Sequence, residues 1–177
     1  MSQKPLYVLV EGPTDQMLFQ SEAMDQVVRQ RFPYAHVITW ASETKDDLVG
    51  LLRGIIADGA PYIFLCDKES AFVCIQTRKQ YALSRCPNVA VDRILIVVRE
   101  IECWYIAGMS QTFSNQYGFA IPDNSEDFAK PRFEDLSTRL KFASPEDMMI
   151  EILKTFSVQN AALRNTSFSR LVEKYLS

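Results

Sequence analysis

Four short apolar runs, each followed by a segment with helical features, constrain the fold of this chain more than any other feature. The runs span residues 5–10, 36–40, 61–66 and 93–98. The first run, PLYVLV, is continuously apolar, which is typical of a strand that is buried on both faces. Strands separated by helices in this way form βαβ units, so the sequence predicts a mostly parallel, Rossmann-like α/β sheet of about four strands flanked by helices.

The segments between these runs have the features of helices. Residues 13–31 begin with Pro13 in a first-turn position, where Asp15 also suits the helix dipole. Residues 44–57 place five leucine and isoleucine side chains on one helical face, and residues 70–85 are expected to be helical or partly so. We therefore expect one helix between each pair of successive strands.

The pattern changes after Glu100. Residues 100–110 are expected to form a helix that leaves the sheet, and residues 111–131 are expected to be rich in loops. We divide the chain into an α/β core, residues 1–110, and a helical extension, residues 111–177, that packs on the core within one domain. Short helices are expected in the extension at residues 133–142, 145–157 and 167–176.

Composition narrows the classes of function. The net charge is −3, so the chain as a whole lacks the basic footprint that nucleic-acid binding usually leaves. The only histidine, His36, argues against a zinc site built from several histidines and against a Ser-His-Asp triad. The four cysteines contain no C-x-x-C pair, and the start of the chain does not resemble a secretion signal. With no apolar run of about eighteen residues, we expect a cytoplasmic protein with no membrane span.

Acidic residues follow three of the predicted strands. Glu11 follows the first strand, Asp67 and Glu69 follow the third, and Glu100 and Glu102 follow the fourth. The carboxyl ends of parallel strands lie at one edge of the sheet, where open α/β sheets place their ligands. We therefore expect these side chains to converge on one patch.

Carboxylates that converge repel one another, and a divalent cation removes that penalty. A site made only of oxygen ligands suits Mg²⁺ or Mn²⁺ rather than zinc. Such an ion could activate a water molecule or stabilise charge on a phosphate during transfer. Taken alone, Asp15 and Asp67 are each also typical of a helix cap.

Four segments of the sequence resemble motifs of known families. V-L-V-E-G-P-T-D, residues 8–15, resembles the first motif of the Toprim (topoisomerase–primase) domain, in which a glutamate and a glycine end the first strand. Asp67-Lys68-Glu69 occupies the place of the second motif, D-x-D, with glutamate in place of the last aspartate. R-E-I-E-C-W-Y-I-A, residues 99–107, and the segment around Ser167 are similar to uncharacterised bacterial families with a Toprim-like core. The E-G-x-T-D form is most similar to the Toprim part of the OLD-family (overcoming lysogenisation defect) nucleases.

This resemblance implies a Toprim-like fold and a set of site residues. Glu11, Asp67 and Glu69 would be catalytic, and Glu11 would act as a metal ligand or as general acid or base. Asp67 and Glu69 would bind Mg²⁺ (or Mn²⁺), and Asp15 and Glu102 are candidates for a second ion. The implied activity is Mg²⁺-dependent phosphodiester processing, as in a nuclease of bacterial DNA maintenance or phage defence.

Alternatives to this activity remain open at the level of sequence. The chain has no P-loop, so any ATP-driven role needs a separately encoded ATPase, and a non-catalytic Toprim-like module that docks on such a partner is one alternative. A receiver-like module with Asp67 at the end of its third strand is another.

Four basic residues are candidates for contacts with the backbone of DNA or RNA. They are Lys68, Arg78, Lys79 and Arg99. If residues 70–85 form one helix, the spacing of Arg78, Lys79 and Arg85 predicts that they share part of its surface. A solvated helix face explains such residues as well.

Overall fold

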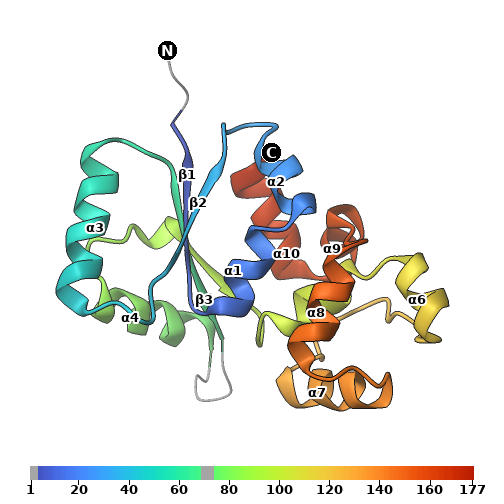
Figure 1. Ribbon diagram of the computed structural model, residues 1–177. Coiled ribbons are helices and arrows are strands. Elements are labelled where there is room, and N and C mark those ends of the chain that lie inside the picture. Colours follow the sequence, from blue (N-terminus) through green and yellow to red (C-terminus); the bar gives the residue numbers. More distant parts are fainter. Residues whose placement is uncertain (1–3, 69–73) are drawn as a thin grey trace.

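The protein is an α/β fold built on one four-stranded parallel sheet (Figure 1). The computed structural model describes residues 4–68 and 74–177. The strand order is β2-β1-β3-β4, and every pair of neighbouring strands is parallel. The predicted Rossmann-like parallel sheet is confirmed. Its strands are β1 (Leu6–Val10), β2 (Ala35–Thr39), β3 (Tyr62–Asp67) and β4 (Ile94–Val97).

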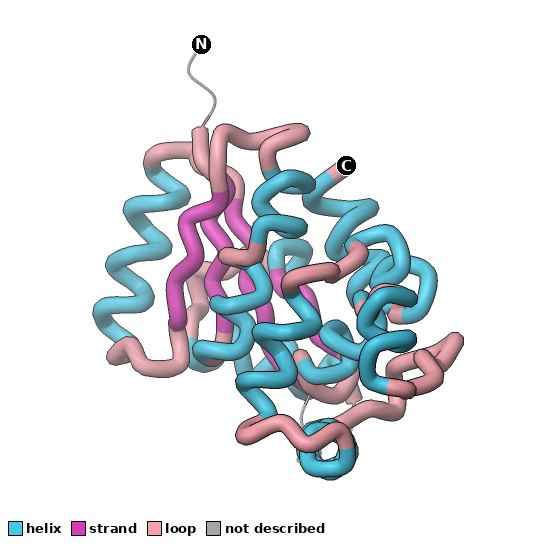
Figure 2. Tube along the Cα trace, turned by 45° about the vertical axis from the view of Figure 1, so that its right-hand side comes forward, coloured by secondary structure: helices cyan, strands magenta, loops and turns pink. Residues whose placement is uncertain are grey.

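Helices cover both faces of the sheet, as Figures 1 and 2 show. One face carries α3 (Lys45–Ala57) and α4 (Ile75–Arg85). The opposite face carries α1 (Pro13–Phe19), α2 (Glu22–Val28), α5 (Glu102–Gly108) and the helices that follow. The sheet therefore has a separate apolar core on each face.

Strand β1 explains why the first apolar run is continuous. Val8 and Val10 belong to the core beneath α1 and α5, whereas Leu9 belongs to the core beneath α3. Successive side chains of a strand point to opposite faces, so a strand covered on both faces needs apolar residues at every position.

The predicted single helix at residues 13–31 is wrong, because this segment forms two helices. Helix α1 ends at Phe19, and α2 begins at Glu22. Between them the Ser21 side chain accepts a hydrogen bond from the Met24 N–H. A serine in this position accepts a hydrogen bond from a backbone N–H that would otherwise be unpaired in the first turn of a helix. This bond favours a second helix that begins after Ser21 over one helix that continues through it.

The segment expected to be rich in loops contains a helix, α6 (Gln111–Tyr117). Ser110 begins it by accepting a hydrogen bond from the Phe113 N–H at 3.1 Å. Gly118 ends it with φ +63°, a left-handed conformation that glycine adopts without strain. Helix α7 (Lys130–Arg139) also begins earlier than predicted, with Pro131 in its first turn.

The single helix predicted at residues 145–157 is replaced by two, α8 (Pro145–Leu153) and α9 (Val158–Arg164). Ser157 begins α9 by accepting a hydrogen bond from the Asn160 N–H. Helix α10 (Thr166–Leu171) and a π-helical turn (Val172–Leu176) then end the chain.

The C-terminal helices share the apolar core of the face that α1, α2 and α5 cover. Trp104 of α5 is fully buried and meets Phe168 of α10 edge to face, with ring centroids 5.0 Å apart. The Trp104 indole N–H donates to the Ser167 hydroxyl at 2.8 Å. Within residues 4–68 and 74–177, the structure contains no helix that is long and apolar enough to cross a membrane.

Candidate functional site

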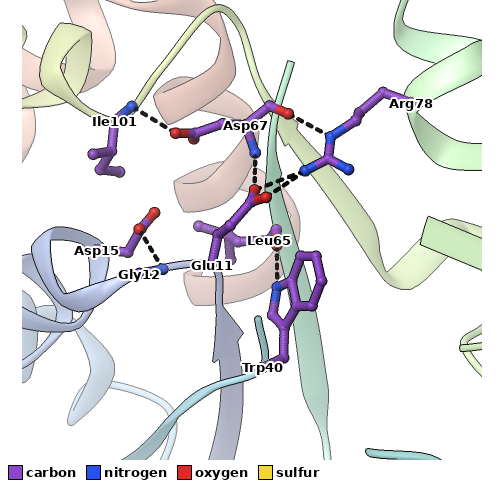
Figure 3. Close-up of polar contacts among 8 residues, drawn as sticks. All are labelled: Glu11, Gly12, Asp15, Trp40, Leu65, Asp67, Arg78 and Ile101. Carbon is purple, nitrogen blue, oxygen red and sulfur yellow. Dashed lines mark hydrogen bonds and ion pairs between the residues drawn. The ribbon is translucent and has the colours of Figure 1, made fainter. Parts of the chain in front are cut away.

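Glu11 stands directly after β1, and both oxygens of its carboxylate are engaged (Figure 3). Its Oε2 accepts a hydrogen bond from the Asp67 backbone N–H at 2.9 Å. The Nη2 of Arg78 lies 2.6 Å from Oε1 and 2.8 Å from Oε2. This charge-assisted pairing partly compensates the charge of the Glu11 carboxylate and holds it against the end of β3.

Arg78 joins the ends of two strands. Its guanidinium contacts Glu11 after β1, and its Nε donates to the backbone carbonyl oxygen of Asp67 at 2.6 Å. The Arg78 side chain is only 1% exposed. Its position therefore differs from the expected exposed nucleic-acid contact, because α4 turns this residue inward, onto the carboxylate of Glu11.

Asp15 lies in the first turn of α1 and is buried, at 3% exposure. Its Oδ2 accepts a hydrogen bond from the Gly12 N–H at 3.0 Å. Its Oδ1 is buried and has no hydrogen-bond partner in the described part of the chain. Burial raises the pKa of Asp15 to about 7, the nearby charge of Glu11 adds to the rise, and the Gly12 N–H opposes it.

Asp67 ends β3, and its carboxylate resembles that of Asp15: one oxygen accepts a backbone hydrogen bond and the other is buried. Its Oδ2 accepts from the Ile101 N–H at 3.4 Å, whereas its buried Oδ1 has no partner among residues 4–68 and 74–177. Burial raises the pKa of Asp67 well above its ordinary value, and the charges of Asp15 and Glu11 raise it further. In Figure 3 the carboxylates of Asp15 and Asp67 lie on one side of the strand ends, and Arg78 approaches from the other.

Glu102 stands in the first turn of α5 and is 7% exposed. Burial is the main cause that raises its pKa, and the charge of Glu100 contributes in the same direction. Glu102 also raises the pKa values of Asp15 and Asp67 through its charge. Glu100 itself accepts a hydrogen bond from the Lys130 N–H at the start of α7.

The structure thus brings four of the predicted site residues to one edge of the sheet. Glu11, Asp15, Asp67 and Glu102 interact electrostatically, and we call them the acidic cluster. Glu69 lies outside the described residues. Among the residues that the structure does describe, no three His, Cys, Asp or Glu side chains are arranged to hold one metal ion.

The donor set of the acidic cluster nevertheless fits a hard divalent cation. It consists only of carboxylate oxygens, the ligands that Mg²⁺ and Mn²⁺ prefer. Two of those oxygens, Asp15 Oδ1 and Asp67 Oδ1, are buried and lack a hydrogen-bond donor within the described ranges. A buried, unpaired carboxylate oxygen is costly, and a cation nearby removes that cost.

The other basic candidates have different surroundings. Arg99 is half exposed and pairs with Asp127 at 3.2 Å, and its backbone has φ +68°. The Lys68 backbone N–H donates to the Val97 carbonyl oxygen at 2.9 Å. Lys79 is half-buried on α4 and lines a groove beside β4.

Three supporting contacts were not predicted from the sequence. The first is the bridge that Arg78 forms between β1 and β3. The second is the Tyr105 hydroxyl, which donates to the Thr14 carbonyl oxygen at 2.7 Å and so ties α5 to the first turn of α1. The third is the Trp40 indole N–H, which donates to the Leu65 carbonyl oxygen at 2.8 Å beneath the site. Nothing in the sequence distinguished Arg78 from a surface residue of an amphipathic helix.

No match to this chain is found among protein-family models, among curated proteins or among solved structures. The class of protein is therefore defined by the fold and the site alone. The chain is an α/β protein with a parallel sheet and an acidic cluster at the carboxyl edge of that sheet.

Proposed function

We propose that the chain is a Mg²⁺-dependent phosphodiester-processing enzyme, specifically a nuclease that acts on DNA or RNA. The observation that carries this proposal is a pair of buried oxygens, one each of Asp15 and Asp67, that lie within a cluster of carboxylates and have no hydrogen-bond partner among the described residues. Burial is the main cause that raises the pKa values of both groups, and a bound divalent cation would relieve the repulsion between carboxylates that raises them further. The motif resemblance to Toprim domains supports the same activity.

The residues of the acidic cluster have distinct roles under this proposal. Asp15 and Asp67 would hold the ion, and Glu69, which lies outside the described residues, would be a further ligand as the motif resemblance implies. When bound, Mg²⁺ stabilises negative charge on a phosphate and lowers the pKa of a bound water. Glu11 receives hydrogen bonds at both oxygens, so it orients Asp67 through the Asp67 backbone N–H. Glu102 is the candidate for a second ion.

A cleavage assay tests the proposal. The purified protein is incubated with single- and double-stranded DNA and RNA in Mg²⁺, in Mn²⁺ and in EDTA. We expect cleavage only with a divalent ion, and a loss of at least about a hundredfold in Asp67→Asn, because the substitution removes a ligand charge while keeping the side-chain shape. Asp46→Asn, an exposed acid in the first turn of α3, is the matched control and should retain full activity. Full cleavage by Asp67→Asn with unchanged metal dependence would refute the mechanism.

A second candidate, a non-catalytic module that acts as partner of a separate ATPase, is favoured by one feature of the site. Both oxygens of Glu11 are already engaged by Arg78 and by the Asp67 N–H, which leaves Glu11 less free to act on a substrate. Titration calorimetry with Mn²⁺ separates the two candidates. Absence of binding heat, together with absence of cleavage, favours the module, whereas binding that is lost in Asp67→Asn favours the enzyme.

A further inference from the structure

The outer edge of β4 faces an open groove. β4 is the last strand of the sheet, and it pairs only with β3 in the described part of the chain. A cavity of about 330 Å³ lies along this edge, lined by β4 residues 94–96 and by side chains of α4, α10 and the π-helical turn. We call this cavity the edge groove.

The direction of the backbone groups shows which residues of β4 face the groove. The Val97 carbonyl oxygen accepts from the Lys68 N–H on the β3 side. The next residue, Val98, donates its N–H to Ser167 on the opposite side, at the start of α10. Successive residues of a strand turn their backbone groups to opposite sides, so the N–H and C=O of Ile96 point away from β3. Ser167 closes the outer edge at Val98, and the Ile94 N–H already donates to the Val91 carbonyl oxygen. The outward groups that face the groove are therefore the Ile94 carbonyl oxygen and the N–H and carbonyl oxygen of Ile96.

The charged residues of the edge groove are mostly basic. Lys79 comes from α4, Arg170 from α10 and Lys174 from the π-helical turn, against one acid, Glu173. In the described part of the chain, neither Lys79 nor Arg170 forms an ion pair, whereas the Lys174 Nζ donates to the Asp92 carbonyl oxygen. Glu173 accepts a hydrogen bond from the Ser169 hydroxyl. A local excess of positive charge on a chain of net charge −3 indicates a partner of opposite charge.

We propose that the edge groove binds an extended acidic peptide segment of another protein, which adds as a strand beside β4. The backbone of such a peptide would pair with the Ile94 carbonyl oxygen and with the N–H and carbonyl oxygen of Ile96, as in known cases of strand addition to a sheet edge. Acidic side chains on one face of the peptide would reach Lys79 of α4, and those on the other face would reach Arg170 and Lys174. A nucleic-acid backbone matches the charges but cannot pair with the strand edge, so the peptide is favoured. This inference is independent of the proposed nuclease activity.

Fluorescence anisotropy tests the charge requirement. The probe is a labelled peptide of about eight residues in which pairs of adjacent Glu residues alternate with Val-Thr pairs, so that both faces carry acids, and its control carries Lys in place of Glu. We expect the wild-type protein to bind the acidic peptide at least about tenfold more tightly than the basic one. The double variant Lys79→Glu/Arg170→Glu should lose at least about tenfold in affinity, whereas Arg53→Glu, an exposed arginine on α3, should lose less than about twofold. Equal binding of the two peptides, or equal losses in the two variants, overturns the proposal.

Amide hydrogen exchange tests the pairing itself. Peptide binding should slow exchange of the Ile96 N–H, while the Leu95 N–H, which lies on the β3 side of the strand, should change little. An oligonucleotide of similar charge should leave the Ile96 amide unchanged. If the oligonucleotide binds as tightly and the peptide fails to protect Ile96, the groove is a polyanion site and the proposal is wrong. The protein alone could instead form a dimer that the double variant abolishes. The occupant of the edge groove would then be a second copy of the chain, and the proposal would be wrong.

Discussion

At the scale of single residues, the site depends on an arginine that compensates a carboxylate. Arg78 is almost fully buried, yet it has partners at both ends of its guanidinium, in Glu11 and in the Asp67 carbonyl. Burial of a charge is tolerated only with such pairing. Arg78 therefore belongs to the site as a positioning residue, although it resembles a surface residue in the sequence.

Removal of Arg78 should cost stability. In Arg78→Met, Glu11 and the Asp67 carbonyl both lose their donor, so we expect the free energy of unfolding to fall by about 2–4 kcal/mol. Urea unfolding measures the change, and Lys79→Met, the next residue of α4, is the matched control. The double variant Glu11→Gln/Arg78→Met should recover part of the loss, because it removes both charges of the pair. Equal losses in Arg78→Met and Lys79→Met would contradict this view of the pair.

Asp15 should make stability depend on pH in a defined direction. Its pKa is about 7 in the folded protein against an ordinary 3.8, so between those values the folded state binds more protons than the unfolded state. Stability from this group is therefore complete below about pH 4 and is lost as pH rises through about 7.

Asp15→Asn removes that dependence, because asparagine stays neutral and can still accept from the Gly12 N–H. In the absence of divalent ions, the variant should be more stable than the wild type at pH 8 by on the order of 2–4 kcal/mol, with little difference at pH 4. Thermal unfolding across this pH range measures the difference. Asp46→Asn should leave the pH profile of the wild type unchanged, and a parallel profile for Asp15→Asn would show that Asp15 titrates normally.

At the scale of elements, close packing limits the choice of residue where α5 ends. A Cβ atom added to Gly108 would lie 2.0 Å from the Phe156 ring, which follows α8. The Ser157 N–H also donates to the Gly108 carbonyl oxygen at 2.9 Å. This hydrogen bond and the close contact with the Phe156 ring hold the end of α5 against the start of α9. Glycine is required here by the close approach and not by its backbone conformation.

Gly108→Ala should therefore destabilise the protein by about 1–3 kcal/mol through overpacking. Adding Phe156→Leu should relieve the clash and recover part of the loss. Gly50→Ala on α3 is the matched control: nothing lies within 4 Å of its added Cβ, so we expect a gain of about 0.5–1 kcal/mol from helix propensity. Denaturant midpoints measure all three variants, and a neutral Gly108→Ala would show that α5 and the Phe156 ring move apart easily.

At the scale of the whole molecule, the larger core combines residues from both ends of the chain. Val8 and Val10 of β1 lie in the same core as Phe168 and Leu171 of α10. The first 110 residues therefore provide only part of the cover for this face of the sheet.

We expect the full chain to unfold in one cooperative transition and a fragment of residues 1–110 to lack fixed tertiary structure. The reason is that truncation exposes the apolar face that α7 to α10 cover. Near-UV circular dichroism and calorimetry test this. A cooperative transition in the fragment would mean that the helical extension is a separate unit.

The sequence predicted the elements whose signal is local. The four strands were predicted to within a residue or two of their observed ends, because each is an apolar run bounded by turn residues. The positions of Glu11, Asp67 and Glu102 at one edge followed from the parallel order alone. The breaks at Ser21 and Ser157 were missed, since an apolar stripe can continue across a point where a serine side chain begins a new helix.

The sequence by itself determined that this chain forms a parallel sheet with acids at its carboxyl edge, because strand periodicity and crossover geometry act through near neighbours in the chain. Only the tertiary structure decided which charges are paired and which are not. Arg78 reaches Glu11 across 67 positions of sequence, while one oxygen each of Asp15 and Asp67 is left without a donor in the described residues. Such pairing depends on distances of a few ångströms between side chains on separate elements, and no local pattern specifies those distances.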